Sequence, residues 1–142
     1  MKYRAVLFDL DGTLNDTIES LKYCGDMVMA KFGYGPFSEE QYKYFVGDGA
    51  ANMIKRALIA GGDTELVHFE RAYTDYLEVF NKYCMYEVKP YDGIRELLTE
   101  LKSRGIYIAV LSNKPHPQTV DVIKALFGKD YFDIFGEPPV RR

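Results

Sequence analysis

A short apolar run that ends in two closely spaced aspartates constrains the fold of this chain more than any other feature. Residues 2–8 predict a strand of the kind that a parallel sheet buries on both faces. Asp9 and Asp11 follow two residues apart, and Gly12 and Thr13 come next. Because side chains alternate along a strand, both carboxylates can leave its carboxyl end on one side. Such a pair repels unless a cation such as Mg²⁺ lies between its oxygens. One carboxylate can then attack phosphorus while the other moves a proton.

Length and composition are those of an ordinary globular domain. The 142 residues fit one domain or a core with a small insert, and 47% hydrophobic and 27% charged residues exclude a disorder-type composition. A net charge of −3 offers no basic surface for nucleic acid. The N-terminus enters a strand at once, and no apolar run reaches the roughly 18 residues of a membrane span. We therefore expect a cytoplasmic protein with neither nucleic-acid nor membrane partners.

The two cysteines are interpreted as buried free thiols. Cys24 and Cys84 lie far apart in the sequence, without the spacing of metal ligands, and each falls on the apolar side of an expected helix. A disulfide between them is the less favoured alternative.

Apolar residues follow helical spacing through the region between the aspartates and the middle of the chain. Asp16 and Glu19 stand three residues apart, as in a capping box, so we expect the first helix to open at Asp16. Ser38 begins a second capping box. Asp63 is expected to cap a long helix that includes Leu66.

The second half of the chain predicts alternating strands and helices. Residues 89–93 are interpreted as a turn in which Asp92 caps the next helix. Residues 106–111 predict a second strand, and residues 131–135 predict a short third strand after a further helix. This order is that of an α/β fold, a partial Rossmann-like core with a parallel sheet and an inserted helical region. The expected domains are residues 1–15 and 87–142 for the α/β core, and residues 16–86 for the helical insert.

A second polar cluster follows the second expected strand. Ser112, Asn113 and Lys114 come directly after it. In an open parallel sheet, ligands bind at the carboxyl ends of the strands, so this cluster and the two aspartates are expected to form one composite site. A plain turn is the alternative for the cluster, and a solvated loop lysine is the alternative for Lys114. His116 is interpreted as a surface or capping residue rather than a catalytic one.

These motifs resemble those of the haloacid dehalogenase (HAD) superfamily of phosphohydrolases. The stretch D-L-D-G-T matches the pattern D-x-D-G-T of the first motif, and L-S-N-K-P-H is similar to the second motif. With the helical insert between them, the pattern looks most like the phosphoglycolate phosphatase branch. The resemblance implies a phosphatase that acts on a small phosphorylated metabolite such as phosphoglycolate. The alternatives within the family are a pyrophosphatase, a sugar-phosphate phosphatase and a phosphoglucomutase.

The resemblance also implies roles for the two aspartates. Asp9 would be the nucleophile that takes the phosphoryl group as an aspartyl phosphate, and it would also bind Mg²⁺. Asp11 would protonate the leaving alcohol and later activate water, and its backbone carbonyl would also bind the metal. The cation would neutralise charge between an anionic nucleophile and an anionic substrate.

Further residues are implied to bind the phosphate or to shape the loop around it. Ser112 would hold the transferring phosphoryl group, with Asn113 beside it, and Lys114 would add positive charge. Gly12 would permit the tight turn after the aspartates, and Thr13 would support that loop.

The helical insert is similar to the mobile cap that gives this family its substrate selectivity. Within it, Gly47, Asp48 and Gly49 resemble a glycine-containing turn that faces the active site in the phosphoglycolate phosphatase branch. A bare turn between two helices is an equally good interpretation of these three residues.

The resemblance supplies only the first half of the family's active site. The third motif, a lysine, is expected just after Arg142, and the acidic fourth motif lies on a later strand. We therefore expect a truncated product or fragment of a longer phosphatase, or else a second copy of the chain that covers the open edge of the first strand. A catalytically inactive remnant with only binding or structural properties is the alternative from another class.

Overall fold

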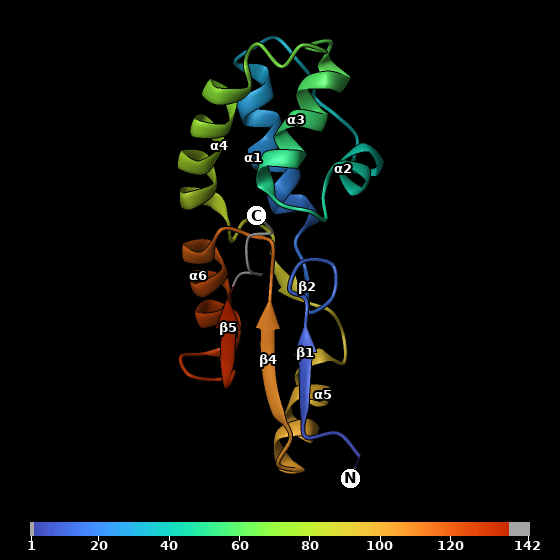
Figure 1. Cartoon of the computed structure of the whole chain (residues 1–142), viewed down its shortest axis with the longest axis vertical. Coiled ribbons are helices and arrows are strands. Elements are labelled where there is room, and N and C mark those ends of the chain that lie inside the picture. Colours follow the sequence, from blue (N-terminus) through green and yellow to red (C-terminus); the bar gives the residue numbers. More distant parts are fainter. Residues whose placement is uncertain (1, 137–142) are drawn as a thin grey trace. The chain divides into compact units, whose positions relative to one another are not determined.

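The chain divides into two compact units, and each is described by itself. The structure is a computed structural model that describes residues 2–136, with side chains as far as Asp133. The sheet unit comprises Met1–Asp16 and Lys89–Arg142, and the helical unit comprises Thr17–Val88. Figure 1 shows the elements of both units along the chain.

A three-stranded parallel sheet forms the centre of the sheet unit. Its strands β1 (Ala5–Phe8), β4 (Tyr107–Leu111) and β5 (Ile134–Gly136) lie in the order β1-β4-β5. In the register of β1 against β4, Ala5 lies opposite Tyr107. The parallel sheet and its helices confirm the expected α/β fold class (Figure 1). Since β5 begins at Ile134, the third strand starts later than predicted.

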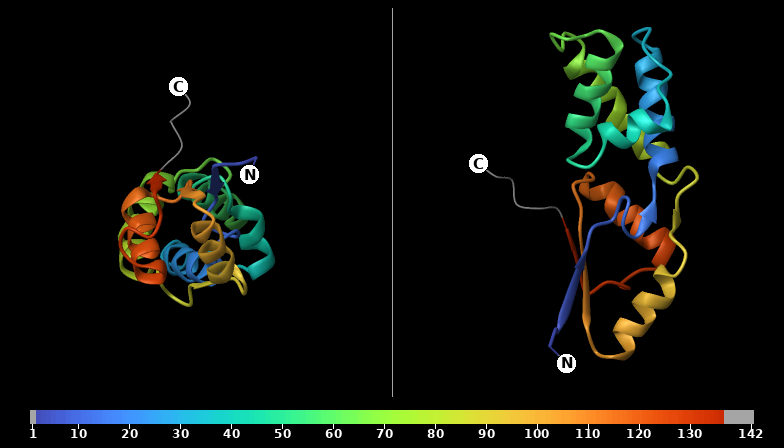
Figure 2. Two further views of the ribbon diagram at one scale, coloured as in Figure 1. Left: turned by 90° about the horizontal axis from the view of Figure 1, so that it is seen from below. Right: turned by 90° about the vertical axis from the view of Figure 1, so that its right-hand side faces the viewer.

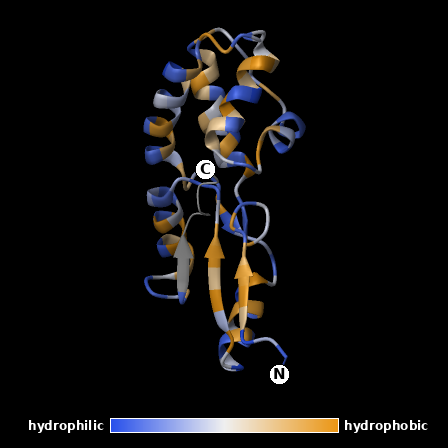
Figure 3. Cartoon of the chain, viewed as in Figure 1, coloured by the Kyte–Doolittle hydropathy of each residue, from blue (hydrophilic) through white to orange (hydrophobic). Residues whose placement is uncertain are grey.

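Two helices cover one face of this sheet. Helix α5 (Ile94–Ser103) precedes β4, and helix α6 (His116–Phe127) connects β4 to β5. Both lie on the same side of the strands in Figure 2. The apolar strand side chains on that side, Ile108 and Val110, are buried. This face therefore holds the apolar core of the unit, and β1 and β4 carry the orange of hydrophobic residues in Figure 3.

The opposite face of the sheet is open among residues 2–136. Leu7 in β1 and Tyr107 in β4 are 62% and 61% exposed, and Tyr3 beside them is also exposed. The prediction that the first strand is buried on both faces is wrong, because β1 forms an edge of the described sheet and has helices on one side only.

A small antiparallel ribbon replaces two features expected from the sequence. Strand β2 (Asn15–Asp16) pairs with β3 (Lys89–Pro90). The prediction that Asp16 caps the first helix is therefore wrong, since its backbone is extended and pairs with Lys89. For the same reason residues 89 and 90 belong to a strand rather than to a turn. The Tyr91 N–H extends this pairing by donating to the Leu14 carbonyl at 3.1 Å.

The helical unit contains four described helices. They are α1 (Ile18–Ala30), α2 (Glu39–Phe45), α3 (Ala50–Gly61) and α4 (Phe69–Tyr83). Helix α1 contacts each of the other three. Their shared core contains large side chains that are fully buried: Met29, Tyr42, Ile54, Leu58, Tyr76 and Phe80. Gly25 lets α1 approach α2 closely, because a Cβ atom there would collide with the Tyr42 ring.

The capping interactions agree with the sequence at only one helix. The capping box of α2 is confirmed: the Gln41 N–H donates to Ser38 Oγ at 3.2 Å, and the Ser38 N–H donates to Gln41 Oε1 at 2.9 Å. Helix α1 instead has Thr17 at its N-cap with no side-chain capping bond, so the predicted box of Asp16 and Glu19 is absent. Helix α5 begins after Gly93, whose φ of 84° makes the turn, and it has no side-chain cap from Asp92.

Asp63 stabilises a turn rather than a helix end. Its carboxylate accepts hydrogen bonds from the N–H groups of Val67 and His68 at 2.8 and 2.9 Å. Helix α4 begins only at Phe69, and Leu66 lies before it with a φ of 55°. The long helix is therefore shorter at its start than predicted, because Asp63 bonds to a non-helical backbone.

Both cysteines are buried and neither forms a disulfide, as predicted. The Ser20 hydroxyl donates to the carbonyl of Cys84 at 3.0 Å, within the helical unit. None of the helices that the structure describes has the length and apolar composition needed to cross a membrane.

Candidate active site

The loop after β1 brings the first motif into a tight turn. The Leu10 carbonyl accepts hydrogen bonds from the N–H groups of Leu14 and Asn15, both at 3.1 Å. The Gly12 N–H donates to the Asn15 carbonyl at 2.9 Å, and Gly12 has a φ of 76° that favours glycine. Leu10 and Leu14 are fully buried and anchor the loop, while Thr13 is exposed on it. Asp11 lies within this turn, bridged to Asn15 through the backbone.

Asp9 carries a carboxylate with a perturbed protonation equilibrium. Partial removal from water raises its pKa, and the neighbouring charge of Asp11 raises it further. The Leu10 N–H opposes both effects, because it donates to Asp9 Oδ1 at 2.8 Å and favours the charged form. Repulsion between the two aspartates is thus part of this site.

The loop after β4 is ordered by two buried hydroxyl groups. Ser112 directly follows this strand, and its Oγ accepts a hydrogen bond from the Lys114 N–H at 3.1 Å. Thr119 in α6 is fully buried, and its hydroxyl lies 3.2 Å from the carbonyls of both Lys114 and Pro115. Asn113, between these contacts, is exposed. The backbone around Lys114 is therefore held on both sides.

An ion pair joins the two loops. Lys114 Nζ lies 3.2 Å from Asp11 Oδ1, with the lysine side chain 1% and the aspartate side chain 26% exposed. Lys114 is thus buried rather than a solvated loop lysine. The parallel pairing of β1 with β4 places both loops at the carboxyl ends of neighbouring strands. His116 is exposed at the start of α6, in agreement with its interpretation as a surface residue.

The two aspartates match part of what a magnesium ion requires. Mg²⁺ is usually bound through one or two carboxylates together with water and phosphate oxygens. Asp9 and Asp11 supply two carboxylates whose mutual repulsion a cation would relieve. The part of the chain that the structure describes holds no group of three or more His, Cys, Asp or Glu side chains arranged for a metal. Two carboxylates alone would leave most of the shell of a magnesium ion to backbone, water and ligand oxygens.

Two residues of this region were not singled out from the sequence. Thr119 orders the Lys114 loop, and its position four residues after Pro115 is the signal for a hydroxyl that bonds back to a carbonyl. Asn15 is fully buried next to the first motif, and neither of its amide atoms has a hydrogen-bonding partner among the described residues. Nothing in the local sequence indicates such burial of an amide.

The predicted cap residues lie in the helical unit. Gly47 and Gly49 have φ angles of 121° and 101°, and Gly49 directly precedes α3. Asp48 between them forms an ion pair with Arg56 of α3, with Arg56 Nη2 2.8 Å from Asp48 Oδ2. The pKa of Asp48 is lowered, first by its hydrogen bond with Arg56. The turn is therefore fixed by an ion pair within its own unit.

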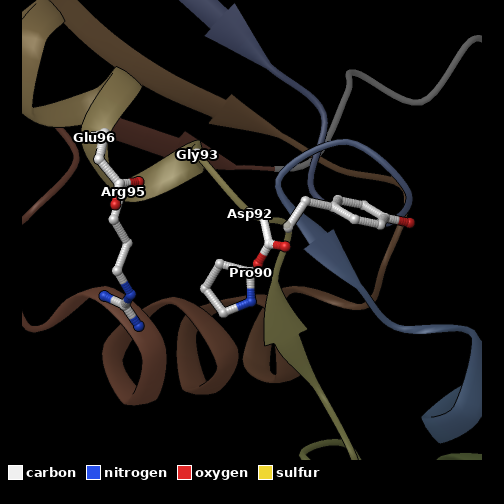
Figure 4. Close-up of a pocket in the computed structure, with 6 residues that line it drawn as sticks. Pro90, Asp92, Gly93, Arg95 and Glu96 are labelled. Carbon is white, nitrogen blue, oxygen red and sulfur yellow. The ribbon is translucent and has the colours of Figure 1, made fainter.

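A small pocket of the sheet unit lies at the start of α5. Figure 4 shows the residues around it. It is lined by Pro90, Tyr91, Asp92, Gly93, Arg95 and Glu96. None of the residues assigned to the phosphate site from the sequence belongs to this pocket.

The arrangement of an α/β sheet unit, an inserted helical unit and acidic residues after the first strand defines a class of hydrolase. Residues 6–137 match the family described as haloacid dehalogenase-like hydrolases. The chain belongs to this family.

The chain is similar to phosphatases of the family over part of their length. A phosphoglycolate phosphatase of Thiobacillus denitrificans is 31% identical over 133 residues, which are 92% of this chain and 59% of the relative. An N-acetylmuramic acid 6-phosphate phosphatase of Pseudomonas aeruginosa is 34% identical over 115 residues, 81% of this chain and 50% of the relative. The chain thus spans between half and six tenths of these curated relatives.

Solved structures show the same fold. The crystal structure of a predicted phosphoglycolate phosphatase from Haemophilus somnus superposes with a TM-score of 0.90 at 20% identity, covering 99% of this chain and 65% of that one. This likeness concerns the fold alone. Both units of the chain, described separately above, therefore have counterparts in a longer protein of the same fold.

Proposed function

We propose that the chain carries the phosphoryl-transfer site of a magnesium-dependent phosphomonoester hydrolase. The observation that carries this proposal is the meeting of the two loops, in which Asp11 after β1 lies 3.2 Å from the buried ammonium of Lys114 after β4. Such a site combines a nucleophilic carboxylate, a second carboxylate for proton transfer and positive charge for a phosphate.

The first half of the reaction transfers the phosphoryl group to the protein. A carboxylate oxygen of Asp9 forms a bond to phosphorus while the bond from phosphorus to the alcohol oxygen breaks. Asp11 gives its proton to the leaving oxygen, so that a neutral alcohol departs. The hydroxyl of Ser112 and the ammonium of Lys114 hold the phosphoryl oxygens, with Asn113 beside them, and Gly12 and Thr13 shape the loop.

The second half restores the protein with water. The Asp11 carboxylate takes a proton from a water molecule, whose oxygen attacks phosphorus as the bond from phosphorus to Asp9 breaks. Inorganic phosphate leaves, and Asp11 is again protonated for the next cycle. Bound at Asp9 and Asp11, Mg²⁺ would neutralise charge between the anionic carboxylate and the anionic substrate.

The substrate that we propose is a small phosphorylated metabolite of the phosphoglycolate type. It is supported by the similarity to phosphoglycolate phosphatases over 92% of this chain. The turn of Gly47, Asp48 and Gly49 is proposed as a contact to the substrate, in a helical unit that acts as a cap. A sugar-phosphate substrate is the second candidate, because a relative of similar identity is an N-acetylmuramic acid 6-phosphate phosphatase. A pyrophosphatase and a phosphoglucomutase remain alternatives on the same scaffold.

The experiment that tests this proposal measures phosphate release by the purified 142-residue chain after its intact mass is confirmed. Phosphoglycolate, a panel of sugar phosphates, pyrophosphate and p-nitrophenyl phosphate are supplied with and without Mg²⁺. We expect Mg²⁺-dependent release that Asp9→Asn lowers on the order of a thousandfold or more, because it removes the nucleophile. Asp130→Asn is the matched control, since it makes the same chemical change at an exposed residue whose φ of 60° suits asparagine.

Two outcomes would contradict the proposal in different ways. No turnover at the correct mass would favour the alternative of a non-catalytic chain with only binding or structural properties. Turnover that survives Asp9→Asn would keep the enzyme but remove the assigned nucleophile. The substrate panel decides between phosphoglycolate and the other phosphates.

A further inference from the structure

The turn between α2 and α3 carries one acidic side chain, Asp48, and that acid is bonded to the helix that follows it (Figure 1). Arg56 of α3 binds both carboxylate oxygens, with Nη2 2.8 Å from Oδ2 and Nη1 against Oδ1. Asn52 of the same helix donates from Nδ2 to Oδ2 at 3.2 Å. A planar guanidinium and an amide therefore hold this carboxylate in one direction.

Arg56 is itself fixed by a contact outside the ion pair. Its Nη1 also donates to the carbonyl of Phe45, the last residue of α2, at 2.8 Å. Asn52 and Arg56 stand four residues apart, so they lie on the same side of α3. The guanidinium thus connects the end of α2, the turn and α3.

The ion pair has a larger effect on the charge of the turn than on the stability of the fold. The side chains of Arg56 and Asp48 are 37% and 50% exposed, and ion pairs with such exposure contribute little to the free energy of unfolding. The pKa of Asp48 is lowered, first by its hydrogen bond with Arg56, so the acid is ionised at neutral pH. An ionised acid repels an anionic ligand unless a cation stays beside it.

We infer that Arg56 is a positioning residue that holds and neutralises Asp48, and that it thereby lets the turn accept a substrate whose organic part carries a carboxylate. This inference rests on the proposed function, because it takes the turn of Gly47, Asp48 and Gly49 as a contact to the substrate. With Arg56 in place the pair is neutral, whereas Asp48 alone would present a negative charge. The class of substrate that depends most on Arg56 is therefore a carboxylated phosphate ester, of which phosphoglycolate is an example.

The test uses two ligands that a phosphatase does not hydrolyse and that differ in one charge. Phosphonopropionate is phosphoglycolate with a methylene group in place of the ester oxygen, and phosphonopropionamide has an uncharged amide in place of its carboxylate. The affinities of the intact chain for both ligands are measured by isothermal titration calorimetry in the presence of Mg²⁺. The ratio of the carboxylate affinity to the amide affinity isolates the contribution of the carboxylate.

The two members of the ion pair predict opposite changes in this ratio. Arg56→Met leaves the Asp48 carboxylate uncompensated, so we expect the ratio to fall about threefold at low ionic strength. Asp48→Asn leaves the guanidinium uncompensated, so we expect the ratio to rise about threefold. Arg56→Lys keeps the charge and should retain the wild-type ratio. A merely structural role of the pair would not give opposite signs, because both substitutions break the same hydrogen bonds.

Arg104→Met is the matched control for Arg56→Met. Arg104 also forms an ion pair, with Nη2 2.6 Å from Oε1 of Glu100, and both side chains are more than half exposed. It lies before the amino end of β4, whereas the loop of the proposed phosphate site follows the carboxyl end of that strand. We expect its affinity ratio to stay within about 1.5-fold of the wild type, because solvent and salt screen an exposed charge over that distance.

The outcomes separate this inference from the proposed function. If the wild type bound neither ligand in the presence of Mg²⁺, the phosphate site and the inference would both fail. If the wild type bound both ligands and the ratio stayed constant, or moved in the same direction, in folded Arg56→Met and Asp48→Asn, the inference would be overturned and the phosphate site would stand. Asp48→Asn preserves the shape of the side chain, so an unchanged ratio in this variant alone would overturn the inference even if Arg56→Met did not fold.

Discussion

Asn15 places a side-chain amide in a fully buried position directly after the loop of the two aspartates. Neither its oxygen nor its nitrogen has a hydrogen-bonding partner within residues 2–136. A buried polar group in this state costs free energy, because the hydrogen bonds that it made with water are not replaced. We expect Asn15→Val to raise the free energy of unfolding by about 1 kcal/mol, as measured by urea denaturation. Valine also suits the extended backbone of β2.

The contrasting variant at the same position is Asn15→Asp, which buries a charge where the amide stood and should lower the unfolding free energy. If Asn15→Val instead destabilised the protein, the amide would have to be hydrogen-bonded in solution.

The residues proposed for the phosphate site could be placed at strand ends from the sequence, but their mutual contacts could not be predicted. Asp9, Asp11 and Ser112 follow apolar runs, so strand periodicity alone placed them at strand ends. The ion pair of Lys114 with Asp11 depends on the register between β1 and β4, which no local pattern specifies. The sequence therefore left open whether this lysine was buried or solvated.

Among the secondary-structure elements, a capping pattern in the sequence predicted a helix start correctly only where no contact with a distant part of the chain competed with it. The box that opens α2 lies within four consecutive residues, Ser38 to Gln41, and formed as predicted. The backbone of Asp16 instead pairs with that of Lys89 in the ribbon of β2 and β3. Because this pairing keeps Asp16 extended, it does not cap α1. At α5, the N-cap position is occupied by Gly93, which has a positive φ, and not by Asp92 as predicted. The approximate location of a helix could thus be predicted more reliably than its first residue and its cap.

The turn before α4 gives a prediction with a defined dependence on pH. The pKa of Asp63 is lowered from 3.8, first by the hydrogen bond from the His68 N–H. A lowered pKa in the folded state stabilises the protein above that ordinary value, and the stabilisation is lost as the pH falls through the lowered pKa. We expect Asp63→Asn to melt at a lower temperature than the wild type at about pH 7, and the difference to shrink at about pH 2.5.

Thermal melting followed by circular dichroism measures both conditions of this prediction. Asp121→Asn is the control, because it removes the same charge from an exposed position of α6. A difference between wild type and Asp63→Asn that grew towards acid pH would contradict the assigned role of the carboxylate.

For the whole molecule, the open face and free edge of the sheet unit are the features with the largest consequence. Leu7 and Tyr107 are exposed on this face, beside a strand whose outer backbone groups have no partner strand in the described sheet. Such an edge pairs readily with another chain. We propose that a second copy of this chain covers it, and we expect the purified protein to sediment as a species larger than a monomer.

Leu7→Lys tests this association, since a charge on an edge strand opposes pairing between sheets. We expect the variant to sediment as a monomer under conditions in which the wild type associates. Val67→Lys is the control, because Val67 is equally apolar and also exposed but lies in the helical unit. A monodisperse wild-type monomer would argue against the second copy.

The ribbon of β2 and β3 has a consequence for how the chain tolerates its insertion. Its two residue pairs, Asn15 with Pro90 and Asp16 with Lys89, hold the segments that enter and leave the helical unit side by side. For the sheet unit, the entire helical unit is therefore a single long loop whose ends are already closed. The entropy of closing a loop grows only slowly with its length, so the ribbon makes the inserted module exchangeable. Selection can replace or enlarge it at small cost to the strands that precede Asp9 and Lys114.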